Sequence, residues 1–390
     1  MSHLEPACAV GSRLPRLTKI KPAPVLSAVF LLLAAGRIVA TDPARPFLGA
    51  IRWDAWHWAP TNDLTAPVRA VERALGPKRY HHRLPFFAKI VSDERVCIAG
   101  YTPAIIAQEI AFAKEAGLDY WAFVLYDTAS PMSQALALYL ESPERDSIHF
   151  CAIADPSIVQ QQSRRIVQLM AKPNYLKVAG CRPLLFAFRF KPTQSDLLKQ
   201  VRSASVEAGC ANPYIVAMND TVQEALGVAE ADAISAYAIV GDGGKHGTPY
   251  AELARSARSF WQQAHKAGAR LVPLAMSGWD RRPRVEHPVP WEPWQKPGIG
   301  LDRYYRMPTP SELAEHIQQA VDWVDAHPEQ CPARVVLIYA WNEHDEGGWL
   351  CPTIGRDGNP DTSRLDAIRN TLELRRQTRL HRTHHKEDRP

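Results

Sequence analysis

The sequence predicts an α/β protein with the architecture of a (β/α)8 TIM barrel, and three observations support this. Eight short apolar runs of β type follow one another along the 390 residues, amphipathic stretches separate most of them, and long segments follow the first and seventh runs. The runs are continuously apolar, which is typical of parallel strands covered on both faces. The expected strands are Leu48 to Asp54, Tyr120 to Tyr126, His149 to Ala154, Leu184 to Arg189, Tyr214 to Met218, Ala233 to Tyr237, Leu271 to Met276 and Val335 to Trp341.

The expected helices show apolar residues at helical spacing. In the stretch Pro103 to Gly117, Ile106, Ile110 and Ala113 share one face, and Gly117 is a typical C-terminal stop signal. This stretch precedes the second strand, and the other helices follow later strands, as a barrel requires. They are Pro131 to Leu140, Ser157 to Ala171, Ser195 to Ala208, Thr221 to Leu226, Tyr250 to Ala267 and Ser311 to Ala326.

Two long segments interrupt the alternation. Residues 55–101 follow the first strand, and residues 277–308 follow the seventh and contain Trp279, Trp291 and Trp294 among several prolines. Both lie on the C-terminal side of their strands, which holds the active site in this architecture. Aromatic side chains there favour a ligand cleft, because sugar rings stack on them. The alternative is that these loops only pack as lids.

The two ends of the chain are expected to lie outside the barrel domain, residues 41–374. Residues 1–40 contain an apolar run from Val25 to Gly36 between basic residues and the small Ala40, which predicts a secretory signal peptide. The run is too short to span a bilayer comfortably, so we expect no stable membrane span after cleavage. Residues 375–390 are basic and almost free of apolar side chains, and we expect them to be disordered. The predicted location is secreted or periplasmic.

Charge and cysteine spacing bound the possible partners. The formal net charge is +5, but both chain ends are strongly basic and the body between them is acidic, so we expect no nucleic-acid partner. The seven cysteines show no CxxC spacing, so no zinc site is indicated, and no metal or organic cofactor is expected. Six remain after signal cleavage and could form disulfides. Cys151 lies in an expected core strand and is predicted to be a buried thiol.

The last expected strand ends in an unusual polar run, from Tyr339 to Trp349 with the sequence YAWNEHDEGGW. On a regular strand Glu343 and Glu346 would point to opposite faces, so they converge only if the chain turns after Asn342, which the two following glycines permit. Two convergent carboxylates suit general acid/base or nucleophilic work at an acetal. The alternative is a solvated acidic loop without catalytic function.

Polar and aromatic residues also follow the other expected strands, and the barrel architecture would bring them to one mouth. Arg284 follows the seventh strand, while Asp155 and Asp220 are more simply explained as helix N-caps. Asp54 could also be a structural ion-pair partner. The candidate substrate-binding residues are Asp54, His57, Tyr126, Arg189, Asn219, Tyr237, Trp279, Asp280, Trp341 and Asn342.

Four segments resemble glycoside hydrolase family 99 and its bacterial family 99-like (WbsX-type) relatives: AQEIAFAKEAGLDYWAFVLYD, YLKVAGCRPLLFAFR, SGWDRRPR and YAWNEHDEGGWLCP. The resemblance covers roughly residues 48–370, and the last motif is the most specific. It implies cleavage of internal α-mannosidic bonds with retention, through a 1,2-anhydro sugar. By the resemblance, Glu343 matches the carboxylate that assists the substrate 2-hydroxyl, and Glu346 matches the acid/base for the leaving group.

The chain departs from the family pattern beside the pair. His344-Asp345 stands where the family has Trp-His, and the run from Gly348 to Pro352 replaces Thr-Gln-Ile-Glu-Pro. Both glutamates keep their spacing, so the chemistry is expected to persist while the wall around the substrate changes. Asp345 beside two glutamates is also expected to raise the pKa of one of these acids.

The sequence therefore predicts an exported glycoside hydrolase that cleaves an α-linked oligo- or polysaccharide with two glutamates. One alternative is a non-catalytic carbohydrate-binding or polysaccharide-assembly protein with the same barrel. A second is a metal-dependent hydrolase that uses Asp54, His57 and acidic strand ends, although no HxH or HExxH spacing supports it.

Overall fold

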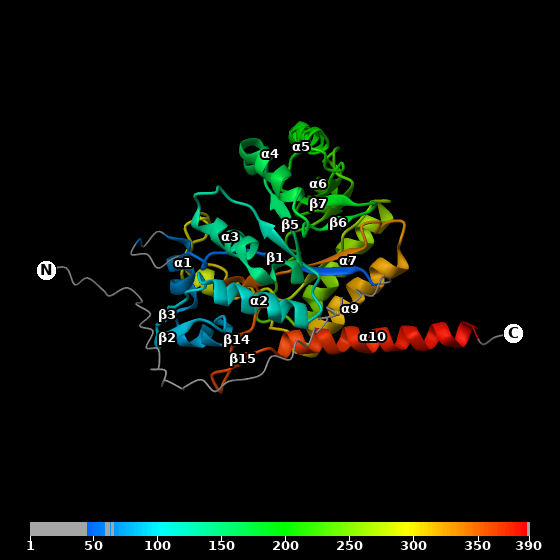
Figure 1. Ribbon diagram of the computed structural model, residues 1–390. Coiled ribbons are helices and arrows are strands. Elements are labelled where there is room, and N and C mark those ends of the chain that lie inside the picture. The colour runs from blue at the N-terminus through cyan, green and yellow to red at the C-terminus, as the bar shows by residue number, and fades with distance from the viewer. Residues whose placement is uncertain (1–44, 59–62, 64–65, 388–390) are drawn as a thin grey trace, which may run out of the picture.

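The computed structural model describes residues 45–58, 63 and 66–387. Eight parallel strands form a barrel in the order β10-β11-β1-β4-β5-β7-β8-β9. Figure 1 shows the chain with helices packed around these strands. A parallel bridge from Ile234 in β9 to Leu271, just before β10, brings the two ends of this order together. The predicted (β/α)8 barrel is thus confirmed. Its strands are β1 (Phe47–Arg52), β4 (Tyr120–Val124), β5 (His149–Ala154), β7 (Arg182–Phe188), β8 (Tyr214–Met218), β9 (Ala233–Ser235), β10 (Leu274–Met276) and β11 (Val335–Tyr339).

The barrel strands are buried on both faces, which explains their unbroken apolar runs. Every residue of β8 and β11 is buried, and the strands belong to one continuous hydrophobic core with the surrounding helices. Gly49 shows how closely the strands pack: a Cβ atom there would lie 2.3 Å from the ring of Tyr120 on the neighbouring strand. A side chain at this position would displace β4.

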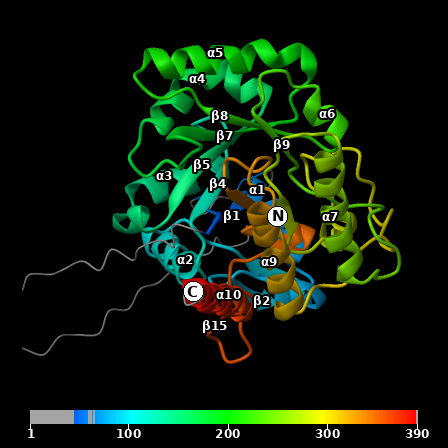
Figure 2. The same ribbon diagram turned by 90° about the vertical axis from the view of Figure 1, so that its right-hand side faces the viewer.

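Helices surround the strands on the outside of the barrel (Figure 2). Asp155 accepts a hydrogen bond from the backbone of Ile158 and is an N-cap, as expected. The short helix that begins at Val222 is capped by Thr221, which forms a capping box with Glu224. The expected cap, the neighbouring Asp220, does not have this role. The helices that cover the barrel are α2 (Pro103–Glu115), α3 (Gln134–Glu141), α4 (Pro156–Met170), α5 (Ser195–Glu207), α6 (Val222–Leu226), α7 (Tyr250–Lys266) and α9 (Pro310–Ala326).

The two long segments have structure of their own. The first carries α1 (Pro67–Leu75), the 3-10 turn η1 (Lys78–Arg83) and the hairpin of β2 (Lys89–Ser92) with β3 (Arg95–Cys97). The second carries α8 (Arg282–Glu286). Residues of the first segment form a smaller hydrophobic cluster, separate from the barrel core. Trp291 of the segment after β10 packs against this cluster. The smaller elements elsewhere are η2 (Pro131–Ser133), η3 (Pro143–Ser147), β6 (Lys177–Val178), η4 (Pro192–Gln194), β14 (Thr353–Ile354) and β15 (Pro360–Asp361).

The C-terminal helix differs from the expectation for the tail. Helix α10 (Ser363–Glu387) packs against α9 and includes residues 375–387, which were expected to be disordered (Figure 1). Arginine, glutamine, leucine and lysine are good helix formers, so a packed helix can continue through a segment that is too polar to build a core. The predicted signal peptide, residues 1–40, lies outside the described residues. Among the helices that the structure describes, none combines the length and apolarity needed to cross a membrane.

The described cysteines include five unpaired thiols, among them the buried Cys151, as predicted. The others are Cys181, Cys210, Cys331 and Cys351. Burial raises the pKa of Cys151 well above its ordinary value, so this thiol is unreactive packing material.

Candidate active site

The chain turns sharply after β11, and this turn brings the two glutamates together. Residues 342 and 343 (β12, Asn342–Glu343) pair antiparallel with β13 (Gly348–Trp349). The 3-10 turn η5 (His344–Glu346) connects them and ends at Gly347, whose φ is +82°. A Cβ atom on Gly347 would lie 2.6 Å from the backbone nitrogen of Asp280, so both the turn and the close packing require glycine here.

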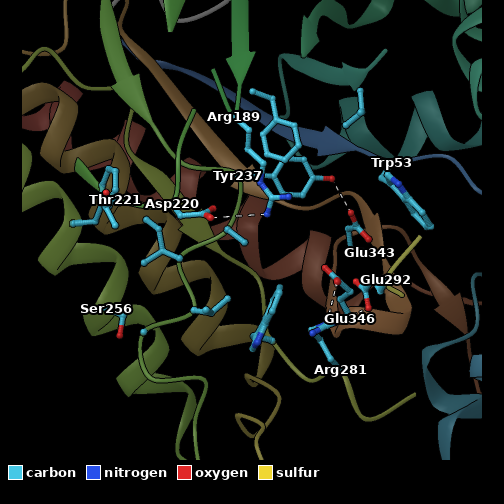
Figure 3. Close-up of a pocket in the computed structure, with 18 of the residues that line it drawn as sticks. Trp53, Arg189, Asp220, Thr221, Tyr237, Ser256, Arg281, Glu292, Glu343 and Glu346 are labelled. Atoms are coloured by element: carbon cyan, nitrogen blue, oxygen red, sulfur yellow. Dashed lines mark hydrogen bonds and ion pairs between the residues drawn. The ribbon is translucent and has the colours of Figure 1, made fainter. Parts of the chain in front are cut away.

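The turn opens onto a cleft of about 790 Å³ at the C-terminal mouth of the barrel. Its walls come from many strand ends: Trp53 follows β1, Tyr126 follows β4, Tyr237 follows β9 and Trp279 follows β10. Glu343 and Glu346 both line it and lie at the same end (Figure 3). The expected convergence of the pair is therefore what the structure shows. A volume of this size is within the range of about 300–1,000 Å³ for ligand sites.

Glu343 is almost fully buried and has two partners. The hydroxyl of Tyr237 donates to its Oε1 at 2.7 Å (Figure 3). Nη2 of Arg284 lies 3.2 Å from its Oε2. Burial and the nearby charge of Glu346 raise the pKa of Glu343 well above its ordinary value, although Arg284 opposes this shift. The side chain thus takes up a proton more readily than an ordinary carboxylate.

Glu346 lies in a cage of donors. Its carboxylate accepts hydrogen bonds from the hydroxyl of Tyr339 and from Arg284, and Nε of Arg281 lies 3.2 Å away. Burial raises the pKa of the Tyr339 hydroxyl well above its ordinary value, so this group stays a donor. The side chain is held in one orientation at the wall of the cleft.

Arg284 connects the whole acidic cluster. Besides Glu343 and Glu346, it contacts Asp345 at 2.7 Å and Glu292 at 3.1 Å, and its side chain is only 4% exposed. Nearby acids raise its pKa well above the ordinary value against the effect of burial, so it stays charged. Together with Arg281, the cluster contains four carboxyl groups and two guanidinium groups. Because the pKa of Glu343 is raised, uptake of a proton by this residue reduces the excess negative charge.

The departures from the family motif do not face the cleft. His344 is fully buried, stacks on Trp349 and contacts the ring edge of Trp56, while Asp345 is fully buried against Arg284. Burial lowers the pKa of His344 to about 4, so it is neutral at physiological pH. These two residues therefore support the turn from behind and do not form its substrate wall.

The structure brings together six of the twelve candidate site residues and leaves six outside the cleft. The cleft is lined by Tyr126, Arg189, Tyr237, Trp279, Glu343 and Glu346. The residues that do not line it are Asp54, His57, Asn219, Asp280, Trp341 and Asn342.

Three of these six belong to a buried ionic network beneath the cleft floor. Nε of Arg52 donates to Asp54 at 2.9 Å, and its Nη2 lies 2.8 Å from Glu109 on α2. His57 lies 3.0 Å from Glu109, and the indole nitrogen of Trp341 donates to Glu109 at 2.9 Å. Burial opposes the charge of Glu109, but Arg52 and His57 lower its pKa to about 2. Asp54, His57 and Trp341 are therefore structural.

Asn342 connects this network to the cleft. Its Oδ1 accepts from the backbone nitrogen of Trp53 at 2.9 Å, and its Nδ2 donates to Asp54 at 3.0 Å. Trp53 lines the cleft, and Glu343 follows Asn342 directly. Asn342 thus fixes the relative positions of an aromatic wall residue and a glutamate without facing the cleft itself.

Asp280 and Asn219 also have structural partners. The buried carboxylate of Asp280 pairs with Arg83 and with Arg282, and although burial opposes its charge, these arginines lower its pKa. The amide of Asn219 donates to the backbone oxygen of Phe190 at 3.0 Å and holds the loop after β7. Both residues follow strand ends as expected, but their side chains turn away from the cleft.

Several cleft residues are missing from the substrate-binding candidates chosen from the sequence, although Trp291, Trp294 and Arg284 were noted in their segment. Arg281, Arg284, Trp291, Glu292 and Trp294 all come from the segment after β10 and line the cleft. The cluster of arginine, proline and tryptophan in this segment was the available signal, but an irregular loop has no periodicity that shows which side chains point inward. Trp53 was missed because it lies inside the expected first strand.

Asp54, His57 and Glu109 do not offer a place for a metal ion. The charged guanidinium group of Arg52 lies among them, at 2.9 Å from both Asp54 and His57, where a cation would have to lie. Across the described part of the chain, no group of three or more His, Cys, Asp or Glu side chains is arranged to hold a metal ion.

Comparisons with known proteins support the fold. The sequence matches no protein-family model and no curated protein. Among solved structures, the chain is similar to the GH99 endo-α-mannosidase from Bacteroides thetaiotaomicron, with a TM-score of 0.53, 14% identity, and coverage of 85% of this chain and 98% of that one. A complex of a GH99 endo-α-mannosidase from the same organism with bis-tris propane has a TM-score of 0.55, also with 14% identity. The chain therefore has a GH99-like fold.

Proposed function

We propose that the protein is an exported glycoside hydrolase that cleaves an α-linked glycan, in the manner of an endo-α-mannosidase. One observation carries the proposal: Glu343 and Glu346 reach one end of an aromatic-lined cleft from a single turn at the end of the last barrel strand. Most glycoside hydrolases cleave the glycosidic bond with a pair of carboxyl groups placed in a cleft of this kind. The fold similarity to GH99 endo-α-mannosidases supports the same reading.

The roles of the two acids are those that the family resemblance implies. Glu343 assists the substrate 2-hydroxyl as it attacks the anomeric carbon: in its ionised form it accepts the hydroxyl proton, and the raised pKa makes this form a stronger base than an ordinary carboxylate. Tyr237 holds it in place through the bond to Oε1. Glu346 donates a proton to the leaving oxygen while O2 of the substrate bonds to the anomeric carbon and forms a 1,2-anhydro sugar. Water then attacks the anomeric carbon and gives a proton to Glu346, the bond between O2 and the anomeric carbon breaks, and Glu343 returns its proton to O2. The anomeric carbon is inverted twice, so the product retains the configuration of the substrate.

The aromatic walls supply the contacts with the sugar. Trp53 and Trp279 line the cleft, and their rings offer apolar faces on which a pyranose can stack. Arg284 lies over the ring of Trp53 with its Cζ 5.1 Å from the centroid, which fixes the orientation of this platform. Glycan binding thus uses rings that the buried network and the acidic cluster keep in position.

A hydrolysis screen tests the proposal. Purified protein is incubated with α-mannan and α-glucan oligosaccharides, and products are followed by mass spectrometry for the wild type, Glu343→Gln, Glu346→Gln and the exposed control Glu207→Gln. We expect the wild type and the control to release shorter oligosaccharides and both site variants to be strongly impaired. NMR of the first product should show the retained α anomer. Full activity in both site variants would contradict the proposal.

The alternative function, a non-catalytic carbohydrate-binding protein, also has one observation in its favour. The carboxylate of Glu346 is engaged by Tyr339, Arg281 and Arg284, and it must leave some of these contacts to reach a glycosidic oxygen. Calorimetric titration with the same oligosaccharides distinguishes the two functions. A binding protein keeps its affinity in Glu346→Gln and shows no turnover in any variant.

Export is a separate part of the proposal. It depends on residues 1–40, whose basic segment and apolar run have the pattern of a signal peptide. Expression of the full chain, with mass analysis of the mature N-terminus, tests it. We expect a mature protein that begins near residue 41, outside the cytoplasm, and a full-length cytoplasmic product would contradict export.

A further inference from the structure

The cleft extends well beyond the two glutamates. In Figure 3, Glu343 and Glu346 lie at one end, and Thr221 and Ser256 lie at the other. Tyr237 and the ion pair of Arg189 with Asp220, 4.0 Å apart, lie between them. The part formed by Thr221, Val222, Ser256, Ser259, Phe260 and Gln263 is called the distal region below.

The distal region exists because one helix of the barrel is very short. Helix α6 has 5 residues, whereas its neighbour α7 has 17. A helix of so few residues covers little of the barrel surface, and the space beside α7 stays open. The segment from Tyr237 to Gly241, which follows β9, lines the passage between this space and the glutamates.

Helix α7 presents a polar stripe to this space. Ser259 and Phe260 lie three and four residues after Ser256, and Gln263 lies four and three residues after them, so all four share one side of the helix. The serines are half-buried, Gln263 is exposed, and Phe260 is a buried apolar base beneath them. A polar side is normal for an amphipathic helix, but here these residues also line the cleft, so their side chains are available to a ligand.

The chemistry of the distal region suits an uncharged sugar unit. Its hydroxyl and amide groups both donate and accept hydrogen bonds, as sugar hydroxyls do, and Gln263 already donates to Ser259 at 3.3 Å. The nearest charged cleft residues, Arg189 and Asp220, pair with each other and add no net charge. A second hollow of about 520 Å³ shares Ser256 and Ser259 with the cleft, and its other lining residues include Asp242, Glu252, Arg255 and Arg258.

We propose that the distal region binds a further sugar unit of the glycan chain whose glycosidic bond lies at Glu343 and Glu346. The inference rests on the proposed function for the identity of the ligand, and it adds that the protein recognises its substrate by chain length as well as by the sugar at the reaction site. A short glycan fills only the end of the cleft near the glutamates, and a longer one reaches α7.

Calorimetry with oligosaccharides of increasing length tests the inference. Binding is measured in the Glu346→Gln background, which prevents turnover, with α-mannan and α-glucan series from the monosaccharide to the hexasaccharide. We expect affinity for one series to rise with length. Adding Ser259→Ala and Gln263→Ala should lower the ratio of hexasaccharide to disaccharide affinity by about tenfold, since two hydrogen-bonding side chains are lost.

A matched control separates this effect from a general one. Gln200→Ala with Ser203→Ala removes the same two side-chain types from the exposed face of α5, and it should leave the affinity ratio unchanged. The blocking variant Ser259→Trp should remove the length dependence even if the alanine changes are tolerated.

The outcome does not depend on catalysis. Length-dependent binding that requires Ser259 and Gln263 upholds the inference even if the wild type hydrolyses nothing. Affinity that does not rise with length in either series, or a ratio that both the alanine and tryptophan variants leave unchanged, overturns it even if hydrolysis is observed.

Discussion

Replacing Arg284 with methionine should destabilise the protein strongly. The guanidinium group contacts Glu343, Asp345, Glu346 and Glu292, and only 4% of its side chain is exposed. Methionine fills much of the same space but leaves buried carboxyl groups without their cation. Removing one partner of a buried ion pair typically costs about 3–5 kcal/mol, and we expect a loss in this range at pH 7. Urea unfolding at constant m-value measures it.

The loss should depend on pH in a defined direction. Glu343 has a raised pKa in the folded protein, so its protonated form contributes stability that is fully present below about pH 4.5, its ordinary value, and is lost as pH rises through the folded pKa. Without Arg284 this pKa rises further. The difference in stability between wild type and variant should therefore be largest at neutral pH and shrink as pH falls toward 4.5.

A surface arginine provides the control. Arg255 is 65% exposed and pairs with Glu252 on the same helix, so Arg255→Met should change stability by no more than about 0.5 kcal/mol. The electrostatic account of the cluster is wrong if the free energy of unfolding of Arg284→Met lies within about 1 kcal/mol of the wild-type value at pH 7. It is also wrong if the difference in this free energy is the same at every pH.

Three further predictions concern the supports of the site. Glu109→Gln should cost about 3–5 kcal/mol of unfolding free energy at pH 7. The lowered pKa of Glu109 contributes stability above pH 4.5 that is lost as pH falls toward about 2, so urea unfolding should show a smaller deficit in acid. The exposed Glu115→Gln on the same helix should leave stability unchanged. Gly347→Ala should lower turnover more than Gly209→Ala lowers it, since both have a left-handed φ but only Gly347 packs against backbone, and equal kcat/KM values would refute this. Asn342→Ala should cost about 1–3 kcal/mol in thermal or urea unfolding, because it leaves the backbone nitrogen of Trp53 without a partner and removes one of the donors to Asp54; an unchanged stability would count against the role given to Asn342.

The barrel could be predicted because its signal is local and repeated. Parallel strands covered on both faces must be apolar throughout, and runs such as Val335 to Tyr339 in β11 carry this pattern without interruption. The position of Glu343 and Tyr237 at strand ends followed from the same register. Their contact in the cleft is a consequence of the architecture.

The division between cleft and buried network could not be predicted. Asp54 follows a strand in the same way as Tyr237 does, yet it turns toward Arg52, a charged residue inside the barrel that the sequence does not distinguish from a surface residue. Its network also needs Glu109, which lies on α2, more than fifty residues away. Long-range pairing of this kind leaves no trace in local periodicity.

The loop after β10 was the other gap. Arg284 follows the seventh strand, but its importance comes from the four carboxyl groups that surround it, and these come from two separate segments. An irregular segment gives the composition of a site but not the direction of its side chains. The tail was misjudged for a related reason, since composition reports the absence of a core and not the absence of a helix.

The leaving-group dependence of the two glutamate variants tests the central claim most directly. Turnover of a glycan with a poor leaving group is compared with that of the matching glycoside with an activated aryl leaving group, which needs little protonation. The account predicts that Glu346→Gln loses activity on the first and keeps much of it on the second, whereas Glu343→Gln is slow on both. If both variants turned over both substrates as fast as the wild type, these two glutamates would not carry the reaction.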